Sequence, residues 1–167
     1  INVCIFALDL IFSARYGYKP LQYYGIQNTT LILDGDVWRL FTAMFLHADI
    51  AHLAGNMISL LYLGSVVRKY YTDLEFIIVY LLSGLFGCFL SFMFLTESFS
   101  LGASGAIMGL GGVLIYRMFF GEYSKSFRQA GNYLMLAFMV IYNLFYGLIR
   151  TGIDNYGHFG GFIAGFF

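Results

Sequence analysis

Four polar residues that lie in apolar stretches of this chain could perform chemistry together. Ser104 stands in Gly-Ala-Ser-Gly at the start of one apolar stretch, and His158 lies at the start of another. A serine hydroxyl becomes an effective nucleophile when a base such as histidine accepts its proton. His52 and Asn56 are four residues apart, so on a helix they share one face and could donate hydrogen bonds into the same cavity. With the free backbone N–H groups expected at a helix start near Ser104, these are the parts of an acyl-transfer site.

Glycines on the same stretches indicate how residues so far apart in sequence could meet. Small residues at spacings of three and four follow both Ser104 and His158: Gly105, Gly109 and Gly112 in the first case, Gly161 and Gly165 in the second. In membranes such faces allow two helix backbones to approach closely. The spacing therefore predicts that the two helices pack together and bring the hydroxyl and the imidazole within reach of each other.

The elements that must position these residues are apolar helices. The chain has 167 residues, 60% of them hydrophobic and only 11% charged, whereas soluble domains are about 25% charged. A membrane-spanning helix needs about 20 apolar residues. Four stretches approach that length: 50–67, 76–95, 101–120 and 129–149. Two shorter stretches lie at the ends of the chain: 1–14 and 155–167. We predict an all-α polytopic membrane protein, a six-helix bundle forming one domain over residues 1–167, with both terminal helices truncated.

Charge and composition exclude several partners. The formal net charge is zero and there is no basic run, so nucleic acid is not an expected partner. The cysteine and histidine spacings do not suggest a metal site, and we expect neither metal nor cofactor. Five Lys and Arg residues fall in the segments 68–75 and 117–128, which places these segments in the cytoplasm by the positive-inside rule. Both chain ends would then be cytoplasmic, with the polar cluster opening to the outer face of a bacterial plasma membrane.

The long segment 15–49 would lie outside and pack as a small subdomain. Trp38 and Arg39 are expected to anchor it at the membrane surface, and His47 to have a structural role there. Asp9 is expected near a membrane edge, with pairing to a neighbouring helix as the alternative. Polar residues of the fifth stretch are expected to form hydrogen bonds between helices or to lie near its ends: Asn132 and Asn143.

Four motifs in register resemble the rhomboid family of intramembrane serine proteases: Trp38-Arg39, His47 to Asn56, Gly102 to Gly109, and Gly157 to Gly165. The resemblance implies that Ser104 is the nucleophile and His158 its general base. It implies that His52 and Asn56 contribute to the oxyanion hole, to which the Ser104 backbone would add a donor. The substrates would be single-pass transmembrane proteins within the lipid bilayer, cut near a small residue. One departure is Gly157, where the family usually has alanine, and it should not disable the dyad.

Two other classes of function stay open at this point. The chain could be a non-catalytic rhomboid-like protein that binds membrane clients, although that class typically lacks the serine or the histidine. It could also be a small transporter or channel, although no internal repeat is visible and the polar residues crowd one half of the predicted membrane. For a protease, the fifth helix and residues 150–156 would form the gate for substrate access.

Overall fold

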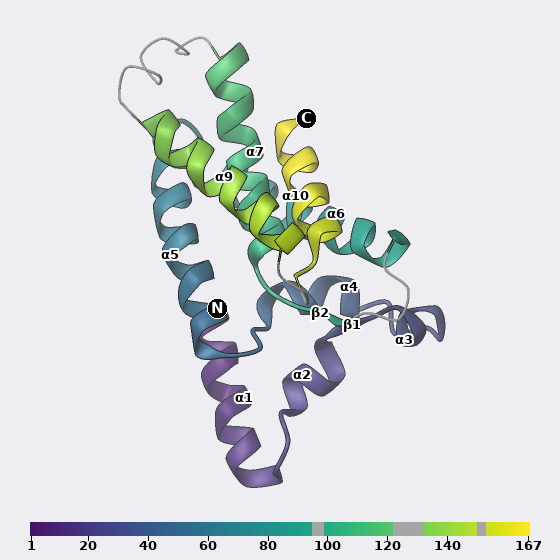
Figure 1. Ribbon diagram of the computed structural model, residues 1–167. Helices are drawn as coiled ribbons and strands as arrows, with labels where there is room; N and C mark the ends of the chain where they lie inside the picture. The colour runs from purple at the N-terminus through teal and green to yellow at the C-terminus, as the bar shows by residue number, and fades with distance from the viewer. Residues whose placement is uncertain (95–98, 122–131, 150–152) are drawn as a thin grey trace.

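The structure is a computed structural model that describes residues 1–94, 99–121, 132–149 and 153–167 (Figure 1). It is mostly helical, as the composition predicted. One helix overlaps each of the six apolar stretches, and α1 and α6 extend beyond the predicted bounds: α1 (Asn2–Tyr16), α5 (Ile50–Val67), α6 (Asp73–Phe94), α7 (Ser104–Phe120), α9 (Asn132–Ile149) and α10 (Asn155–Phe166).

Within the described residues, α5 and α6 are long and apolar enough to cross a membrane. α7 is apolar as well but has 17 residues. Two of the six predicted spans are thus supported by length and composition, and the number six stays a prediction. α1 forms a helix as expected, but its packing is mainly against α2 (Pro20–Gly25), away from the main group of helices (Figure 1).

The centre of the molecule is a three-helix contact. α10 packs against both α6 and α7, and α6 packs against α7, while α5 and α9 flank α7 (Figure 1). A Cβ atom at Gly161 would overlap the carbonyl oxygen of Gly105, and one at Gly165 would overlap that of Gly109. The predicted close packing of the two glycine faces is confirmed.

The contribution of α6 to this contact was not predicted. A Cβ atom at Gly87 would lie 2.5 Å from the Gly157 carbonyl oxygen and 3.3 Å from the Gly161 backbone nitrogen. α10 is therefore held between two helices at backbone distance. This arrangement restricts where His158 can move, because α10 cannot approach or leave one neighbour without disturbing the other.

The segment before α5 forms a small subdomain, as predicted. It contains short elements only: α2, β1 (Gln27–Asn28), α3 (Thr29–Leu33), α4 (Arg39–Thr42) and the 3₁₀ helix η1 (Ala43–Phe45). β1 pairs antiparallel with β2 (Phe99–Ser100), with Gln27 opposite Ser100. This pairing attaches the subdomain to the segment that leads into α7.

Arg39 organises this subdomain from inside and does not anchor it at a surface, which corrects the prediction. The residue is 3% exposed, and its Nε donates to Asp36 Oδ2 at 2.9 Å. Its Nη1 donates to the carbonyl oxygens of Tyr23 and Ile26, at 3.1 and 3.0 Å. Trp38 is half exposed, as a surface anchor would be, and its Nε1 donates to the Tyr24 carbonyl oxygen.

Asp9 pairs with a neighbouring helix, which confirms the alternative prediction; its position near a membrane edge stays a prediction. The residue is 2% exposed, and its Oδ1 accepts a hydrogen bond from the Leu21 backbone nitrogen at 2.8 Å. Leu21 follows Pro20 in the first turn of α2, where backbone N–H groups lack partners within the helix. Asp9 therefore caps α2 from the adjacent helix.

Candidate active site

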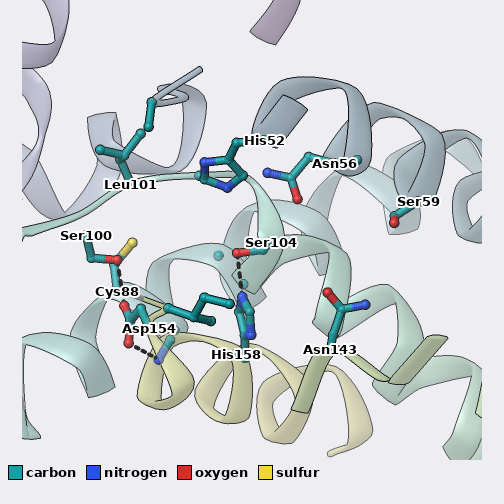
Figure 2. Close-up of a pocket in the computed structure, with 18 of the residues that line it drawn as sticks. His52, Asn56, Ser59, Cys88, Ser100, Leu101, Ser104, Asn143, Asp154 and His158 are labelled. Carbon is teal, nitrogen blue, oxygen red and sulfur yellow. Dashed lines mark hydrogen bonds between the residues drawn. The ribbon is translucent and has the colours of Figure 1, made fainter. Parts of the chain in front are cut away.

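The structure brings Ser104 and His158 together. His158 Nε2 lies 2.8 Å from Ser104 Oγ, a hydrogen-bond distance, although the residues are 54 positions apart (Figure 2). Ser104 is the first residue of α7, and His158 lies in the first turns of α10, where its backbone nitrogen donates to the Asp154 carbonyl oxygen. The glycine contacts described above lie beside and one turn beyond this pair, so the backbone packing of the two helices sets the distance between the side chains.

A glycine with a positive φ angle precedes α7. Gly102 has φ of 132°, a conformation that side-chain-bearing residues rarely adopt, and its backbone nitrogen donates to the Ala43 carbonyl oxygen at 3.0 Å. A Cβ atom at this position would lie 2.8 Å from His52 Nε2. Glycine is therefore needed here for two reasons: the turn itself, and the close approach of the chain to His52.

His52 and Asn56 lie on α5, across the cavity from His158 (Figure 2). Asp49 caps this helix, because its Oδ1 accepts from the His52 backbone nitrogen at 2.8 Å, and this hydrogen bond lowers the pKa of Asp49. Asn56 is buried, and in the described part of the chain its Nδ2 has no hydrogen-bond partner. A buried N–H group without a partner is a donor that a ligand could satisfy.

The start of α7 adds backbone donors to the same place. The N-cap residue Ala103 makes no side-chain hydrogen bond, and the first N–H groups of a helix have no partner inside it. The Ser104 N–H thus lies at the positive end of the helix dipole. Donors from α5 and from α7 therefore face one cavity, an arrangement that can hold an oxyanion.

His47 is buried beside His52, and the structural role expected of it stays a prediction. It is 1% exposed, and its ring lies 5.1 Å from the His52 ring in an edge-to-face contact. Its carbonyl oxygen accepts from Gln22 Nε2 at 2.7 Å. Burial, together with the neighbouring His52, lowers the pKa of His47 to about 4, so it is neutral at pH 7.

A cavity of about 740 Å³ contains all four predicted site residues. It lies between α5, α6, α7, α9, α10 and the β2 segment, and polar groups line much of it: His52, Asn56, Ser59, Ser100, Ser104, Asn143, Asp154 and His158 (Figure 2). α9 contributes Phe138 and Tyr142 to the same wall. The volume is sufficient for water and for several residues of an extended peptide.

The asparagines predicted to form hydrogen bonds between helices do not both do so. Asn143 lines the cavity, and its Nδ2 donates to the Met139 carbonyl oxygen of its own helix at 2.8 Å. The side chain of Asn132 and residues 150–152 of the predicted gate lie outside the described part of the chain.

Asp154 and Ser100 belong to the site but were not predicted. Asp154 Oδ1 accepts from the Gly157 backbone nitrogen at 2.7 Å, and Oδ2 accepts from Ser100 Oγ at 2.6 Å (Figure 2). An aspartate just before an apolar helix is an N-cap signal that the sequence does contain. Its bond to Ser100 could not be read from the sequence, because it depends on how β2 is placed.

The fold and the site describe a helical protein of membrane-spanning composition, with a serine and a histidine in contact inside a cavity. The family model described as Rhomboid domain matches residues 34–167. The Rhomboid protease GluP of Bacillus subtilis (strain 168) is 36% identical over 100% of this chain and 32% of its own length. RHOMBOID-like protein 2 of Arabidopsis thaliana is 34% identical, over 93% of this chain and 53% of its own length. Rhomboid-like protease 1 of Toxoplasma gondii is 33% identical, over 88% of this chain and 50% of its own length.

The chain belongs to the rhomboid family, as its four motifs predicted. It spans about a third of the length of the Bacillus relative and about half of the Arabidopsis and Toxoplasma relatives. Rhomboids are membrane proteins, which agrees with the apolar α5 and α6.

Proposed function

We propose that this chain is the catalytic core of an intramembrane serine endopeptidase that uses Ser104 and His158 as a dyad. The observation that supports this most directly is the 2.8 Å contact between His158 Nε2 and Ser104 Oγ inside a polar-lined cavity. The relatives named as proteases give independent support for the reaction class. Neither a metal nor a cofactor is needed for this chemistry.

The reaction follows from the contact. His158 Nε2 accepts the Ser104 proton as Oγ attacks the carbonyl carbon of the peptide bond. The tetrahedral intermediate collapses, the C–N bond breaks, and the leaving amine takes the proton from His158. Water then attacks the acyl-enzyme with His158 again as the base, which releases the carboxylic acid and restores Ser104.

The negative oxygen of each tetrahedral intermediate would be held by donors from two helices. Asn56 Nδ2, buried and without a partner in the described residues, is one of them, and the Ser104 N–H is another. His52, beside Gly102, would be the third. Removal of one such donor typically lowers kcat about 10²–10³-fold.

Substrates would be single-pass transmembrane proteins cut in or near their spanning helix. A helix hides its carbonyl groups within its own hydrogen bonds, so residues that weaken the helix should favour cleavage. We propose a six-helix membrane bundle whose cavity opens to the outer face of a bacterial plasma membrane, since hydrolysis needs water from one side. α9 and the start of α10 would form the gate.

Labelling with a fluorophosphonate probe tests the dyad directly. Attack by Ser104 Oγ on phosphorus expels fluoride and leaves a covalent adduct. We expect labelling of the wild type and none of Ser104→Ala or His158→Ala. Ser65→Ala is the matched control, because this serine is exposed and, within the described residues, its hydroxyl donates to the Tyr62 carbonyl oxygen of its own helix.

Equal labelling of the wild type and Ser104→Ala would reject the dyad. Absence of labelling, together with retained binding of a transmembrane client, would instead support the non-catalytic rhomboid-like alternative. Ion or solute flux in vesicles without cleavage would support a channel.

A further inference from the structure

One carboxylate in the cavity has no part in the proposed acyl transfer. Asp154 uses both of its oxygens within the protein: Oδ1 accepts from the Gly157 backbone nitrogen at 2.7 Å, and Oδ2 from Ser100 Oγ at 2.6 Å. Both bonds are short and charge-assisted, and such bonds are roughly twice as strong as neutral ones. The first caps α10, whereas the second reaches a different segment of the chain.

The two partners of Asp154 are each close in sequence to one member of the dyad. Gly157 immediately precedes His158, and Ser100 is the last residue of β2, four residues before Ser104. Ser100 is also paired with Gln27 of β1, so the small subdomain before α5 contacts the same strand. Asp154 is therefore a direct side-chain link between the segment that carries the nucleophile and the helix that carries the base.

Gly157 fits the close approach of this carboxylate. A Cβ atom at Gly157 would lie 2.6 Å from Asp154 Oδ2 and 2.9 Å from Cγ. The carboxylate thus lies against the α10 backbone with no intervening side chain. Asp154 would have to shift to accommodate a larger residue at this position.

We propose that Asp154 is a positioning residue, whose carboxylate clamps the end of β2 to the start of α10 and so keeps Ser104 and His158 in register during the reaction. This inference rests on the proposed protease function. Within the described residues the carboxylate accepts hydrogen bonds from the Ser100 hydroxyl and the Gly157 backbone N–H, so it acts by linking these two segments and not as the third member of a triad.

Four variants distinguish positioning by hydrogen bonds from an effect of the negative charge of Asp154 on His158. They are Asp154→Asn, Asp154→Ala, Ser100→Ala and the Asp154→Ala/Ser100→Ala double variant. Asparagine keeps an oxygen for the Gly157 N–H and offers an N–H to Ser100 Oγ, so we expect its rate to stay within about 3-fold of wild type. Misplacement of reacting groups by about 1 Å can lower the reaction rate about 100-fold. We expect Asp154→Ala and Ser100→Ala to lower kcat by about 10- to 100-fold with little change in KM. The double variant should be no slower than Asp154→Ala alone.

The readouts are kcat and KM on a transmembrane substrate, the rate of fluorophosphonate labelling, and the pH profile of both. Loss of the α10 cap could also weaken the fold, so Thr72→Ala is the matched control. Its hydroxyl accepts from the Glu75 backbone nitrogen at the start of α6. We expect Thr72→Ala to leave kcat unchanged. Ser100→Ala leaves the α10 cap intact, and it keeps the proposal testable if Asp154→Ala does not fold.

An Asp154→Asn variant as slow as Asp154→Ala, with a displaced pH profile, would overturn the clamp in favour of a charge effect on His158. Wild-type rates for both Ser100→Ala and Asp154→Ala would also overturn it. Either result leaves the dyad standing if the wild type is labelled and Ser104→Ala is not. If labelling of the wild type equals that of Ser104→Ala, it is the proposed function that fails.

Discussion

Substitution of Gly161 by alanine should separate the serine from its base. A Cβ atom there would lie 2.6 Å from the Gly105 carbonyl carbon, whereas carbon atoms pack at about 3.5–4.0 Å. The two helices must therefore move apart by about 1 Å, and Gly105 directly follows Ser104. The 2.8 Å distance from His158 Nε2 to Ser104 Oγ would rise to about 3.8 Å, beyond the range of a hydrogen bond.

Loss of general-base catalysis costs about 10²–10⁴-fold, so the labelling rate of Gly161→Ala by a fluorophosphonate should fall by at least about 100-fold. Alanine favours helix over glycine by about 1 kcal/mol, so the helix content measured by circular dichroism should not fall. Gly64→Ala is the matched control: it makes the same change on α5, and the nearest atoms belong to the Phe76 ring, at 3.3 Å. A Gly161→Ala protein labelled at the wild-type rate would refute the argument that backbone contact sets the dyad distance.

Three further substitutions probe the parts around the dyad. Gly102→Ala should abolish labelling and lower the unfolding temperature, because φ of 132° is strained for alanine and the new methyl group would crowd His52. Asn56→Ala should lower kcat on a transmembrane substrate by about 10²–10³-fold with KM nearly unchanged, since the donor acts on the oxyanion. Arg39→Met should lower the free energy of unfolding by about 1–3 kcal/mol, measured by denaturant titration, because the Tyr23 and Ile26 carbonyl oxygens lose their hydrogen-bond donor and Asp36 loses its ion-pair partner.

The site could be predicted in large part because its determinants are local or periodic. The spacing of Gly105, Gly109, Gly161 and Gly165 is a property of two single helices, and it predicted their contact. The starts of α5 and α10 agree with the change from polar to apolar sequence, whereas α6 and α7 begin at Asp73 and Ser104, three residues before and after the predicted starts. The juxtaposition of Ser104 and His158 followed from these two facts together.

Other features could not be predicted, because they depend on segments that meet only in the folded chain. Nothing in the spacing of Ser100 and Asp154 indicates that β2 reaches the start of α10. The buried position of Arg39 depends on carbonyl groups supplied by α2 and the turn after it. In the sequence Asp9 is an isolated charge in an apolar stretch, and its partner, the Leu21 backbone nitrogen in the first turn of α2, lies beside it only in the folded chain.

The way the helices are held together bears on how the site can work in a membrane. In lipid the hydrophobic effect does not drive two helices to associate, so close packing and hydrogen bonds must stabilise their contact. Here α10 meets α6 and α7 through glycines, at backbone distance, with no flexible side chain between them. Side chains can change rotamer in nanoseconds, whereas packed backbones cannot move without disturbing their neighbours. A histidine placed in this way stays aligned with Ser104 at the edge of the cavity, where side-chain packing alone would leave it free to turn away. Apolar substitutions on outward-facing positions of α6, such as Leu82 or Phe89, should therefore spare the dyad, whereas alanine at Gly161 or Gly165, where the new methyl group would meet backbone atoms of α7, should not.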